Sequence, residues 1–261
     1  MINDFKNMIW SFSRVNTFNT CPYAWYMNYL QHEPDDGSAF TEVGLLMHEI
    51  LEKYAKEELT LFDVSEYFEE HFNEKVRHAF PPSKVDLRQK YYDDCIEYLN
   101  DINLPLLFKD FEILGVEKEV RFNVGKYKFI GYIDLLLRGK DTGKIMILDH
   151  KSANLKFKKN GDISKTDLEH YKSFKRQLYL YSKAVMEEYN EELGYLAWNL
   201  FRSGRLHIIP WNEKDYNEAL NWAEETIDEI IQEELWLPKN DSKYFCNNIC
   251  GQRNNCDFKE I

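Results

Sequence analysis

Two neighbouring stretches, GYIDLLL (131–137) and ILDHKS (147–152), decide the fold of this chain. Each is a short run of Leu and Ile that contains charged residues, and turn residues at 139–143 separate the two. Such runs are typical of buried strands joined by a tight connection. Because an unpaired charge is costly to bury, the presence of Asp134, Asp149 and Lys151 in these strands requires an explanation.

A symmetric hairpin centred between Asp141 and Thr142 brings the three charged residues together. In that register Asp134 lies directly opposite Asp149, and opposed side chains of an antiparallel pair are roughly 4.5–5.5 Å apart at Cβ. Lys151 lies two residues beyond Asp149 and therefore on the same face. The prediction depends on this register, since a shift by one residue would separate the faces.

Two opposed carboxylates suit a hard cation such as Mg²⁺ or Mn²⁺, which retains waters and accepts phosphate oxygens. Such a metal acidifies an attacking water, while a nearby lysine orients that water or neutralises developing charge. The alternative is a buried Asp–Lys ion pair without a catalytic role, which is the usual explanation of a lone D-x-K in a strand. The second aspartate, Asp134 in matching register, favours the metal site.

Three helical residues extend this group. His48 lies on the apolar side of a helix expected over 41–58, where it is either a core residue or a further metal ligand. Gln177 and Tyr181 lie four residues apart on a long helix expected over 167–190 and therefore share one face. Taken alone, these two are ordinary helix residues.

The remaining pattern predicts a mixed α/β domain with a helical insertion. Further helices are expected over 12–31, 64–79, 86–100 and 213–236, and strands over 117–124, 126–138, 144–151, 193–201 and 205–210. In the last helix the residues expected to face inward are Leu220, Ile227, Ile230 and Ile231. We expect one domain over 1–261, with the insertion at about 55–115 and a cysteine-bearing C-terminal segment at 240–261.

The chain has five cysteines, and three of them, Cys246, Cys250 and Cys256, lie within eleven residues. In a reducing compartment this crowding favours metal ligation over disulfides. Together with the distant Cys21 they can complete a four-thiolate set around an iron–sulfur cluster or a zinc ion. Cys95 lies in a helical pattern and is expected to be a core residue.

The net charge of −12 argues against a nonspecific nucleic-acid coat protein, but the charge is unevenly spread. Residues 151–176 hold eight Lys or Arg against three acids, whereas residues 213–234 hold nine acids and one Lys. These are either two solvated faces of opposite sign or, because the basic stretch begins at Lys151, a loop that faces DNA. We predict the second.

The chain shows no sign of membrane insertion or export. No apolar run reaches the roughly 18 residues that span a bilayer, and the N-terminus lacks a signal-peptide pattern. A soluble, cytoplasmic protein is therefore expected.

The order GLLMHEI (44–50), GYIDLLL, ILDHKS and QLYLYSKAV (177–185) resembles the RecB-type branch of the PD-(D/E)XK nucleases. That branch has a histidine on an early helix, an aspartate on one strand, D/E-x-K on the next and Q-x-x-x-Y on the following helix. The resemblance implies a restriction-endonuclease-like core with a mixed central sheet. It implies metal binding by His48, Asp134, Asp149 and the backbone carbonyl of His150. It also implies a catalytic Lys151, with Gln177 and Tyr181 positioning DNA or the active site.

The cysteines resemble those of the iron–sulfur subset of this branch, which is AddB-like and similar to the CRISPR-adaptation nucleases. That subset has one cysteine before the nuclease core and three after it, and SFSRVNTFNTCPYAWYMNYL (11–30) is similar to its opening helix. The resemblance implies a [4Fe-4S] cluster held by Cys21, Cys246, Cys250 and Cys256. Here three residues rather than two separate Cys246 from Cys250, and zinc with the same ligands stays the alternative.

The leading hypothesis is therefore a Mg²⁺- or Mn²⁺-dependent deoxyribonuclease, acting as an exonuclease on duplex ends or single-stranded DNA. Aromatic residues near a basic groove would suit unstacked bases. One alternative is a non-catalytic DNA-binding subunit of a recombination or defence complex, which the intact Asp134, Asp149 and Lys151 argue against. The other is a zinc-stapled interaction protein. Protein partners in a recombination, replication or defence complex fit the hypothesis, and a membrane does not.

Overall fold

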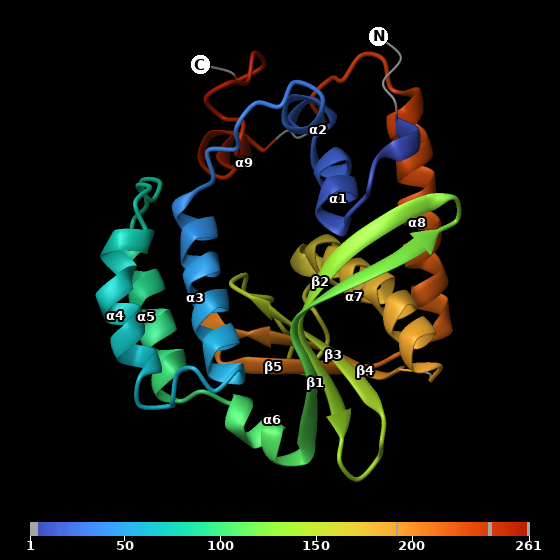
Figure 1. The fold of residues 1–261 in the computed structure, drawn as a ribbon. Coiled ribbons are helices and arrows are strands. Elements are labelled where there is room, and N and C mark those ends of the chain that lie inside the picture. Colours follow the sequence, from blue (N-terminus) through green and yellow to red (C-terminus); the bar gives the residue numbers. More distant parts are fainter. Residues whose placement is uncertain (1–4, 192, 240–241, 260–261) are drawn as a thin grey trace.

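A mixed five-stranded sheet lies at the centre of the molecule, with helices on both of its faces (Figure 1). The computed structural model describes residues 5–191, 193–239 and 242–259. The strands, which lie in the sheet in chain order, are β1 (Phe111–Val124), β2 (Tyr127–Gly139), β3 (Ile145–Lys151), β4 (Leu193–Leu200) and β5 (Arg205–Pro210). Among these five described strands, β3 and β4 are the pair that runs parallel, and helix α7 (Leu168–Tyr189) connects them.

The register of the β2–β3 hairpin is the predicted one. Leu135 pairs with Leu148 and Leu137 with Met146 across the turn. Continuing that register places Asp134 opposite Asp149, at the end of the ladder. The hairpin prediction is therefore confirmed.

Both faces of the sheet are buried, which explains why β2 and β3 are almost uniformly apolar. On one face Leu136 and Ile147 join a core formed with α1 (Phe12–Thr20), α7 and α8 (Glu213–Gln232). On the other face Leu135 and Leu148 join a core formed with α3 (Ala39–Ala55), α4 (Val64–Lys75) and α5 (Leu87–Asn100). Alternate residues of each strand thus enter opposite cores.

The prediction of a single helix over 12–31 is wrong, because the helix is interrupted at Cys21. Cys21 has an extended backbone (φ −159°, ψ 107°), and Pro22 begins a second helix, α2 (Pro22–Tyr29). Proline is favoured in a first helical turn because it has no N–H to leave unsatisfied. The cap of α1 is Ser11, whose side chain accepts a hydrogen bond from the backbone N–H of Arg14.

Two element boundaries also differ from expectation. Strand β1 begins at Phe111 rather than at 117, directly after a short helix, α6 (Leu104–Asp110), that was not expected. Helix α8 ends at Gln232 rather than at 236, and Ile231 is 39% exposed instead of facing inward. The other three residues expected to face inward, Leu220, Ile227 and Ile230, do pack against the core.

The C-terminal segment, which includes α9 (Lys243–Asn248), packs beside α2 (Figure 1). Gln252 is 1% exposed, and its Nε2 donates to Asn28 Oδ1 at 2.5 Å and to the Pro34 carbonyl at 3.1 Å. Asp36 N donates to the Gly251 carbonyl at 3.0 Å. Of the segment expected at 240–261, residues 240, 241, 260 and 261 lie outside the described residues. Among the helices of the described part, none is long and apolar enough to cross a bilayer.

Candidate active site

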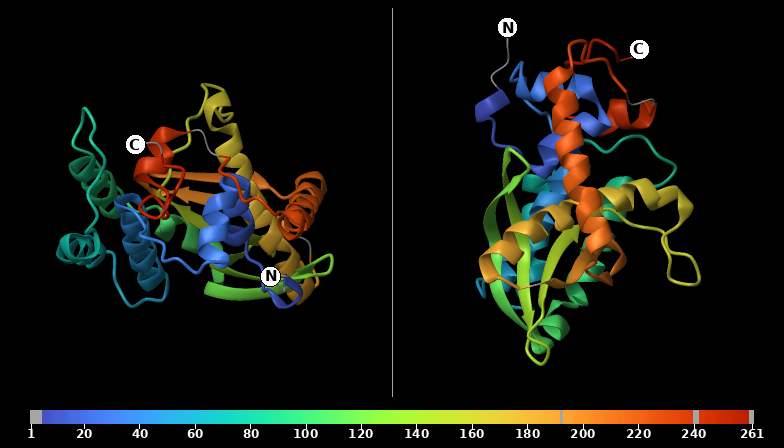
Figure 2. Two further views of the ribbon diagram at one scale, coloured as in Figure 1. Left: turned by 90° about the horizontal axis from the view of Figure 1, so that it is seen from above. Right: turned by 90° about the vertical axis from the view of Figure 1, so that its right-hand side faces the viewer.

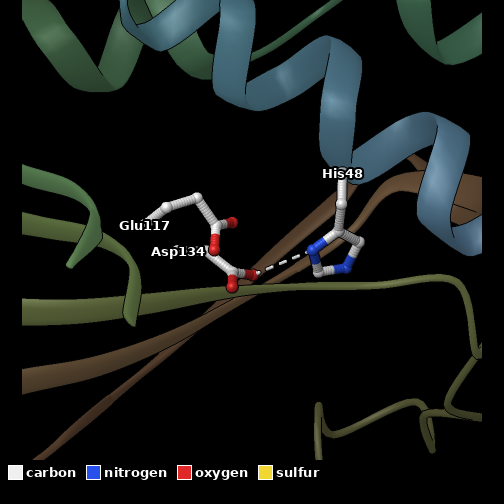
Figure 3. Close-up of side chains that lie close together, drawn as sticks. All are labelled: His48, Glu117 and Asp134. Atoms are coloured by element: carbon white, nitrogen blue, oxygen red, sulfur yellow. Dashed lines mark ion pairs between the residues drawn. The ribbon is translucent and has the colours of Figure 1, made fainter. Parts of the chain in front are cut away.

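An open cleft of about 600 Å³ lies between α3 and the sheet. The side chains that line it include His48 and Glu52 from α3, Glu117 from β1, Asp134 from β2 and Lys151 from β3. Figure 3 shows three of these, His48, Glu117 and Asp134, pointing toward one another. The cleft therefore collects acidic, basic and imidazole groups from four separate elements.

The three charged residues of the hairpin meet beside this cleft. Lys151 Nζ lies 2.8 Å from Asp149 Oδ2, and the Asp149 residue is only 4% exposed. Asp134 Oδ2 accepts a hydrogen bond of 2.7 Å from the backbone N–H of His150. The predicted convergence is present in the structure.

The negative charges of the Asp134 and Asp149 carboxylates repel each other. Burial, followed by the negative charge of Asp149, raises the pKa of Asp134 well above its ordinary value, and the His150 N–H and Lys151 offset only part of this. Burial, with a contribution from Glu52, likewise raises the pKa of Glu117. A cation in the cleft would relieve this repulsion, because an opposite charge favours the ionised carboxylates.

Both ring nitrogens of His48 face oxygen atoms of the site, and the hydrogen bond of Nε2 fixes the ring. Its Nε2 lies 2.9 Å from the His150 carbonyl oxygen, and its Nδ1 lies 3.5 Å from Asp134 Oδ2. A carbonyl oxygen only accepts hydrogen bonds, so Nε2 carries the proton and Nδ1 presents a lone pair. Because burial lowers the pKa of His48, the neutral ring is the favoured form, and a neutral imidazole is the form that binds metals.

Gln177 and Tyr181 both contact the active-site strands. Gln177 Oε1 accepts a hydrogen bond of 2.8 Å from Lys151 Nζ, so the ammonium is held between this amide and Asp149. Tyr181 is buried against β2, and burial raises the pKa of its hydroxyl, which therefore stays protonated. Both side chains thus contact residues of the two active-site strands, and a role of either in positioning the site or DNA stays a prediction.

Sequence reasoning missed two residues of this region. Glu117 lies opposite Asp134, because Val116 pairs with Leu135 and Lys118 with Ile133. The signal was present, since a tight turn at Gly125 gives this register by the same symmetry that paired β2 with β3. Asn199 Nδ2 of β4 lies 2.9 Å from His150 Nδ1 and orients the buried imidazole of His150. The backbone carbonyl of the same histidine accepts the hydrogen bond from His48.

The four clustered cysteines line one cavity of about 440 Å³: Cys21, Cys246, Cys250 and Cys256. Burial raises the pKa of Cys250, and the other three thiols contribute in the same direction. Within the described residues, the one group of three His, Cys, Asp or Glu ligand atoms that all lie within 4.8 Å is His48, Glu117 and Asp134. No three of the cysteine sulfurs are therefore that close together. Cys95 lies elsewhere, is completely buried in α5 and is the core residue that was expected.

The basic stretch divides into two parts. Lys175 pairs with Asp215 of α8 at 2.8 Å, and Arg176 pairs with Glu218 at 2.5 Å, so the basic and acidic stretches neutralise each other here. Lys172 also lies 3.4 Å from Glu218. In the segment that projects between β3 and α7 (Figure 2), the ammonium groups of four lysines form no ion pair within 4 Å among the described residues: Lys156, Lys158, Lys159 and Lys165. The backbone N–H of Lys156 donates to Asp167 Oδ2 at 2.7 Å.

The family model of the PD-(D/E)XK nuclease superfamily matches residues 9–261, and the chain belongs to this superfamily. Among solved structures, one from Eubacterium rectale described as "Putative exonuclease" is similar at 15% identity, with a TM-score of 0.56, and covers 97% of this chain and 90% of that chain. Another, described as SSO0001, is 19% identical, has a TM-score of 0.33 and covers 66% of this chain and 79% of that chain. No curated protein matches. The first likeness supports the fold, and the expected α/β PD-(D/E)XK core is confirmed.

Proposed function

We propose that this chain is a metal-dependent deoxyribonuclease that hydrolyses phosphodiester bonds, acting as an exonuclease on duplex ends or single-stranded DNA. The observation that carries the proposal is the meeting of Asp134, Asp149 and Lys151 beside one cleft, in a chain of the PD-(D/E)XK nuclease superfamily. An ion pair with a purely structural role would need neither the second carboxylate nor an opening to solvent.

The residues present fit a divalent metal ion. Its ligands would be Asp134, Asp149, His48 and the His150 carbonyl, and the bound ion would acidify water and offset charge on phosphorus. Lys151 Nζ, fixed by Asp149 and Gln177, is placed to orient the attacking water or to donate to a phosphate oxygen. Gln177 and Tyr181 hold these groups in place by packing α7 on the sheet.

The unpaired lysines of the projecting segment support DNA as the substrate. Lys156, Lys158 and Lys159 lie in the segment that follows β3, and their ammonium groups form no ion pair within 4 Å in the described part of the chain. Lysines of this kind bind phosphates with release of counterions. The cleft is open to solvent, which suits a single DNA strand or the frayed end of a DNA duplex.

We also propose that Cys21, Cys246, Cys250 and Cys256 hold a [4Fe-4S] cluster. A zinc ion with Zn–S bonds of about 2.3 Å keeps any two of its sulfurs within about 4.6 Å. Among the described residues no three of the cysteine sulfurs all lie within 4.8 Å of one another, so they do not form the compact set that one zinc ion needs. A less compact set around a cavity of about 440 Å³ suits a group of several atoms better than a single ion.

The test is to incubate anaerobically purified protein with end-labelled single- and double-stranded DNA in Mg²⁺, Mn²⁺ or EDTA. Asp149→Asn removes one active-site charge, and Asp141→Asn in the exposed turn is the matched control. We expect cleavage with either metal and none in EDTA, abolished by the first variant and kept by the second. Binding without cleavage would identify a DNA-binding subunit, and colourless protein with stoichiometric zinc and no cleavage would identify a zinc-stapled interaction protein.

A further inference from the structure

Glu117 is an additional carboxylate in the cleft, outside the residue pattern by which this chain resembles RecB-type nucleases. It lies opposite Asp134 on the neighbouring strand, as the flanking pairs of β1 and β2 show. One ligand atom each from His48, Glu117 and Asp134 can be chosen so that all three lie within 4.8 Å of one another (Figure 3). A single cation placed among them would reach all three.

Glu117 has no direct cationic partner among the described residues. No described residue donates a hydrogen bond to its carboxylate or forms an ion pair with it within 4 Å. Lys56 acts on Glu117 electrostatically, but its Nζ is ion-paired with Glu52 at 2.5 Å. The two facing carboxylates, Glu117 and Asp134, thus form no ion pair with a lysine or arginine within 4 Å among the described residues.

The imidazole of His48 independently points to a ligand at this place. Its protonated Nε2 donates to the His150 carbonyl, so that the lone pair of Nδ1 faces Asp134 Oδ2 at 3.5 Å. Two acceptors in this arrangement repel unless a cation or a proton lies between them. Metal-binding histidines characteristically donate their other N–H to a carbonyl or carboxylate, which fixes the ring and its tautomer.

The backbone at Glu117 agrees with a special role for its side chain. Its φ is +48°, a left-handed conformation that is unfavourable for a residue with a Cβ and unusual inside a strand. Strained residues of this kind concentrate at functional sites.

We propose that Glu117 is a further direct ligand of the catalytic cation, beside His48 Nδ1 and Asp134. This deepens the proposed function, on which it rests for the presence of a metal. One imidazole nitrogen with two carboxylates suits a transition-metal ion better than Mg²⁺, which prefers an all-oxygen environment. The site should therefore bind Mn²⁺ more tightly than Mg²⁺.

The test measures metal binding by the full chain without DNA. Mn²⁺ is titrated calorimetrically into the wild type, Glu117→Gln and Glu119→Gln. Glu119 is the matched control, because it lies on the same strand, faces Arg121 at 2.7 Å and loses the same charge. We expect Glu117→Gln to weaken Mn²⁺ binding about tenfold or more, since even indirect partners of a metal site contribute that much. Glu119→Gln should leave the affinity nearly unchanged.

A second readout separates ligation from a mere effect of charge. Water-proton relaxation reports the number of waters on bound Mn²⁺, and this number should rise in Glu117→Gln because water replaces the lost oxygen. Equal affinity, or weaker binding with an unchanged water number, would overturn the assignment. If Glu117→Gln does not fold, as judged by its melting in EDTA, Glu117→Asp replaces it and should bind Mn²⁺ with an intermediate affinity. An affinity of Glu117→Asp equal to that of the wild type would then overturn the assignment.

These outcomes are independent of nuclease activity. Mn²⁺ binding that depends on Glu117 in a protein that cleaves no DNA would support the ligand and reject the proposed function. Metal-dependent cleavage by the wild type, together with normal Mn²⁺ binding by Glu117→Gln, would support the proposed function and reject Glu117 as a ligand.

Discussion

The ring of Tyr181 occupies the space where a side chain on Gly131 would begin. A Cβ added to Gly131 would lie 2.3 Å from Tyr181 Cε1, which is far too close for any real contact. Gly131 thus lets α7 approach β2 closely, three residues before Asp134. Gly131 of the GYID stretch and Tyr181 of Q-x-x-x-Y therefore pack directly against each other, and this contact fixes α7 relative to β2.

We predict that Gly131→Ala destabilises the fold by roughly 1–3 kcal/mol, because a buried ring must move to admit the new methyl group. Gly44→Ala is the matched control, since a Cβ there meets Ser152 Oγ at an ordinary 3.6 Å. In the middle of α3 that change should stabilise by about 0.5–1 kcal/mol. Urea denaturation of both variants measures the difference, and a Gly131→Ala protein as stable as wild type would contradict the contact.

The sequence predicted the β2–β3 hairpin well because two independent signals agreed there. The apolar runs set the strands, and the paired charges made sense only in the register that the structure has. Local signals were weaker elsewhere. The break at Cys21 was hidden by continuous helical patterning, although the following proline is a known first-turn residue.

Other parts of the site depend on tertiary contacts that no local pattern contains. The hydrogen bond from His48 to the His150 carbonyl arises only when α3 packs beside the sheet. The pairing of Lys175 with Asp215 joins two segments that looked like separate charged faces. Each of these required the packing of helices on strands, which periodicity alone does not fix.

Asp134 should make the metal-free protein less stable as the pH rises. Its raised pKa means that the folded protein holds the proton more tightly than the unfolded chain does. Its contribution is therefore fully present below the ordinary carboxyl pKa and is lost as the pH rises through the folded pKa. Asp134→Asn imitates the protonated acid, so in EDTA it should melt above wild type at about pH 8, and by less at about pH 4.

Asp141→Asn in the exposed turn is the control for this series and should show no such pH trend. Mn²⁺ should raise the melting temperature of the wild type more than that of Asp134→Asn, because the ion binds only the folded site. If Asp134→Asn melts below wild type at every pH, the aspartate is a stabilising partner and not a strained acid.

The backbone strain at Glu117 gives a separate stability prediction. In an ordinary strand, a protein with glycine at a given position is less stable than one with alanine there by roughly 0.5–1 kcal/mol. At a φ of +48° the order should reverse, because glycine adopts this conformation without a steric cost. We therefore expect Glu117→Gly to exceed Glu117→Ala in stability in EDTA. The melting temperatures of the two variants, measured by calorimetry, test this expectation. A Glu117→Ala variant that melts above Glu117→Gly would show that the strain is absent.

The lysines of the projecting segment should govern the salt dependence of DNA binding. Replacing Lys156, Lys158 and Lys159 by alanine should reduce the slope of log K against log salt by about 0.7–0.9 for each phosphate that the variant no longer neutralises. Lys172→Ala with Lys175→Ala is the control, because these lysines already pair with acids of α8. Fluorescence anisotropy in EDTA measures both, and an unchanged slope in the triple variant would assign that segment to solvated surface.

The cysteine cavity should stabilise the protein rather than take part in hydrolysis, because phosphodiester cleavage moves no electrons. A cluster there would join Cys21 to Cys246, closing a loop of more than two hundred residues. If the estimate for disulfides transfers, closing so long a loop stabilises by roughly 4 kcal/mol or more, and ligand binding adds to this. We expect brown protein that contains iron and sulfide, and a Cys250→Ser variant that is colourless and melts lower.

Loss of this cluster should also affect the active site, although no cysteine is among the residues that line the catalytic cleft. Ile249, next to Cys250, lines the catalytic cleft, and Gln252 holds the loop at Pro34 that leads into the helix of His48. Cys250→Ser should therefore lose activity through a displaced cleft wall. Cys95→Ser is the matched control: it places a hydroxyl in the core and lowers stability, yet should keep its iron and its colour. A Cys250→Ser protein that melts like wild type would disprove the clamp, whereas a colourless wild type with stoichiometric zinc would disprove only the iron–sulfur assignment.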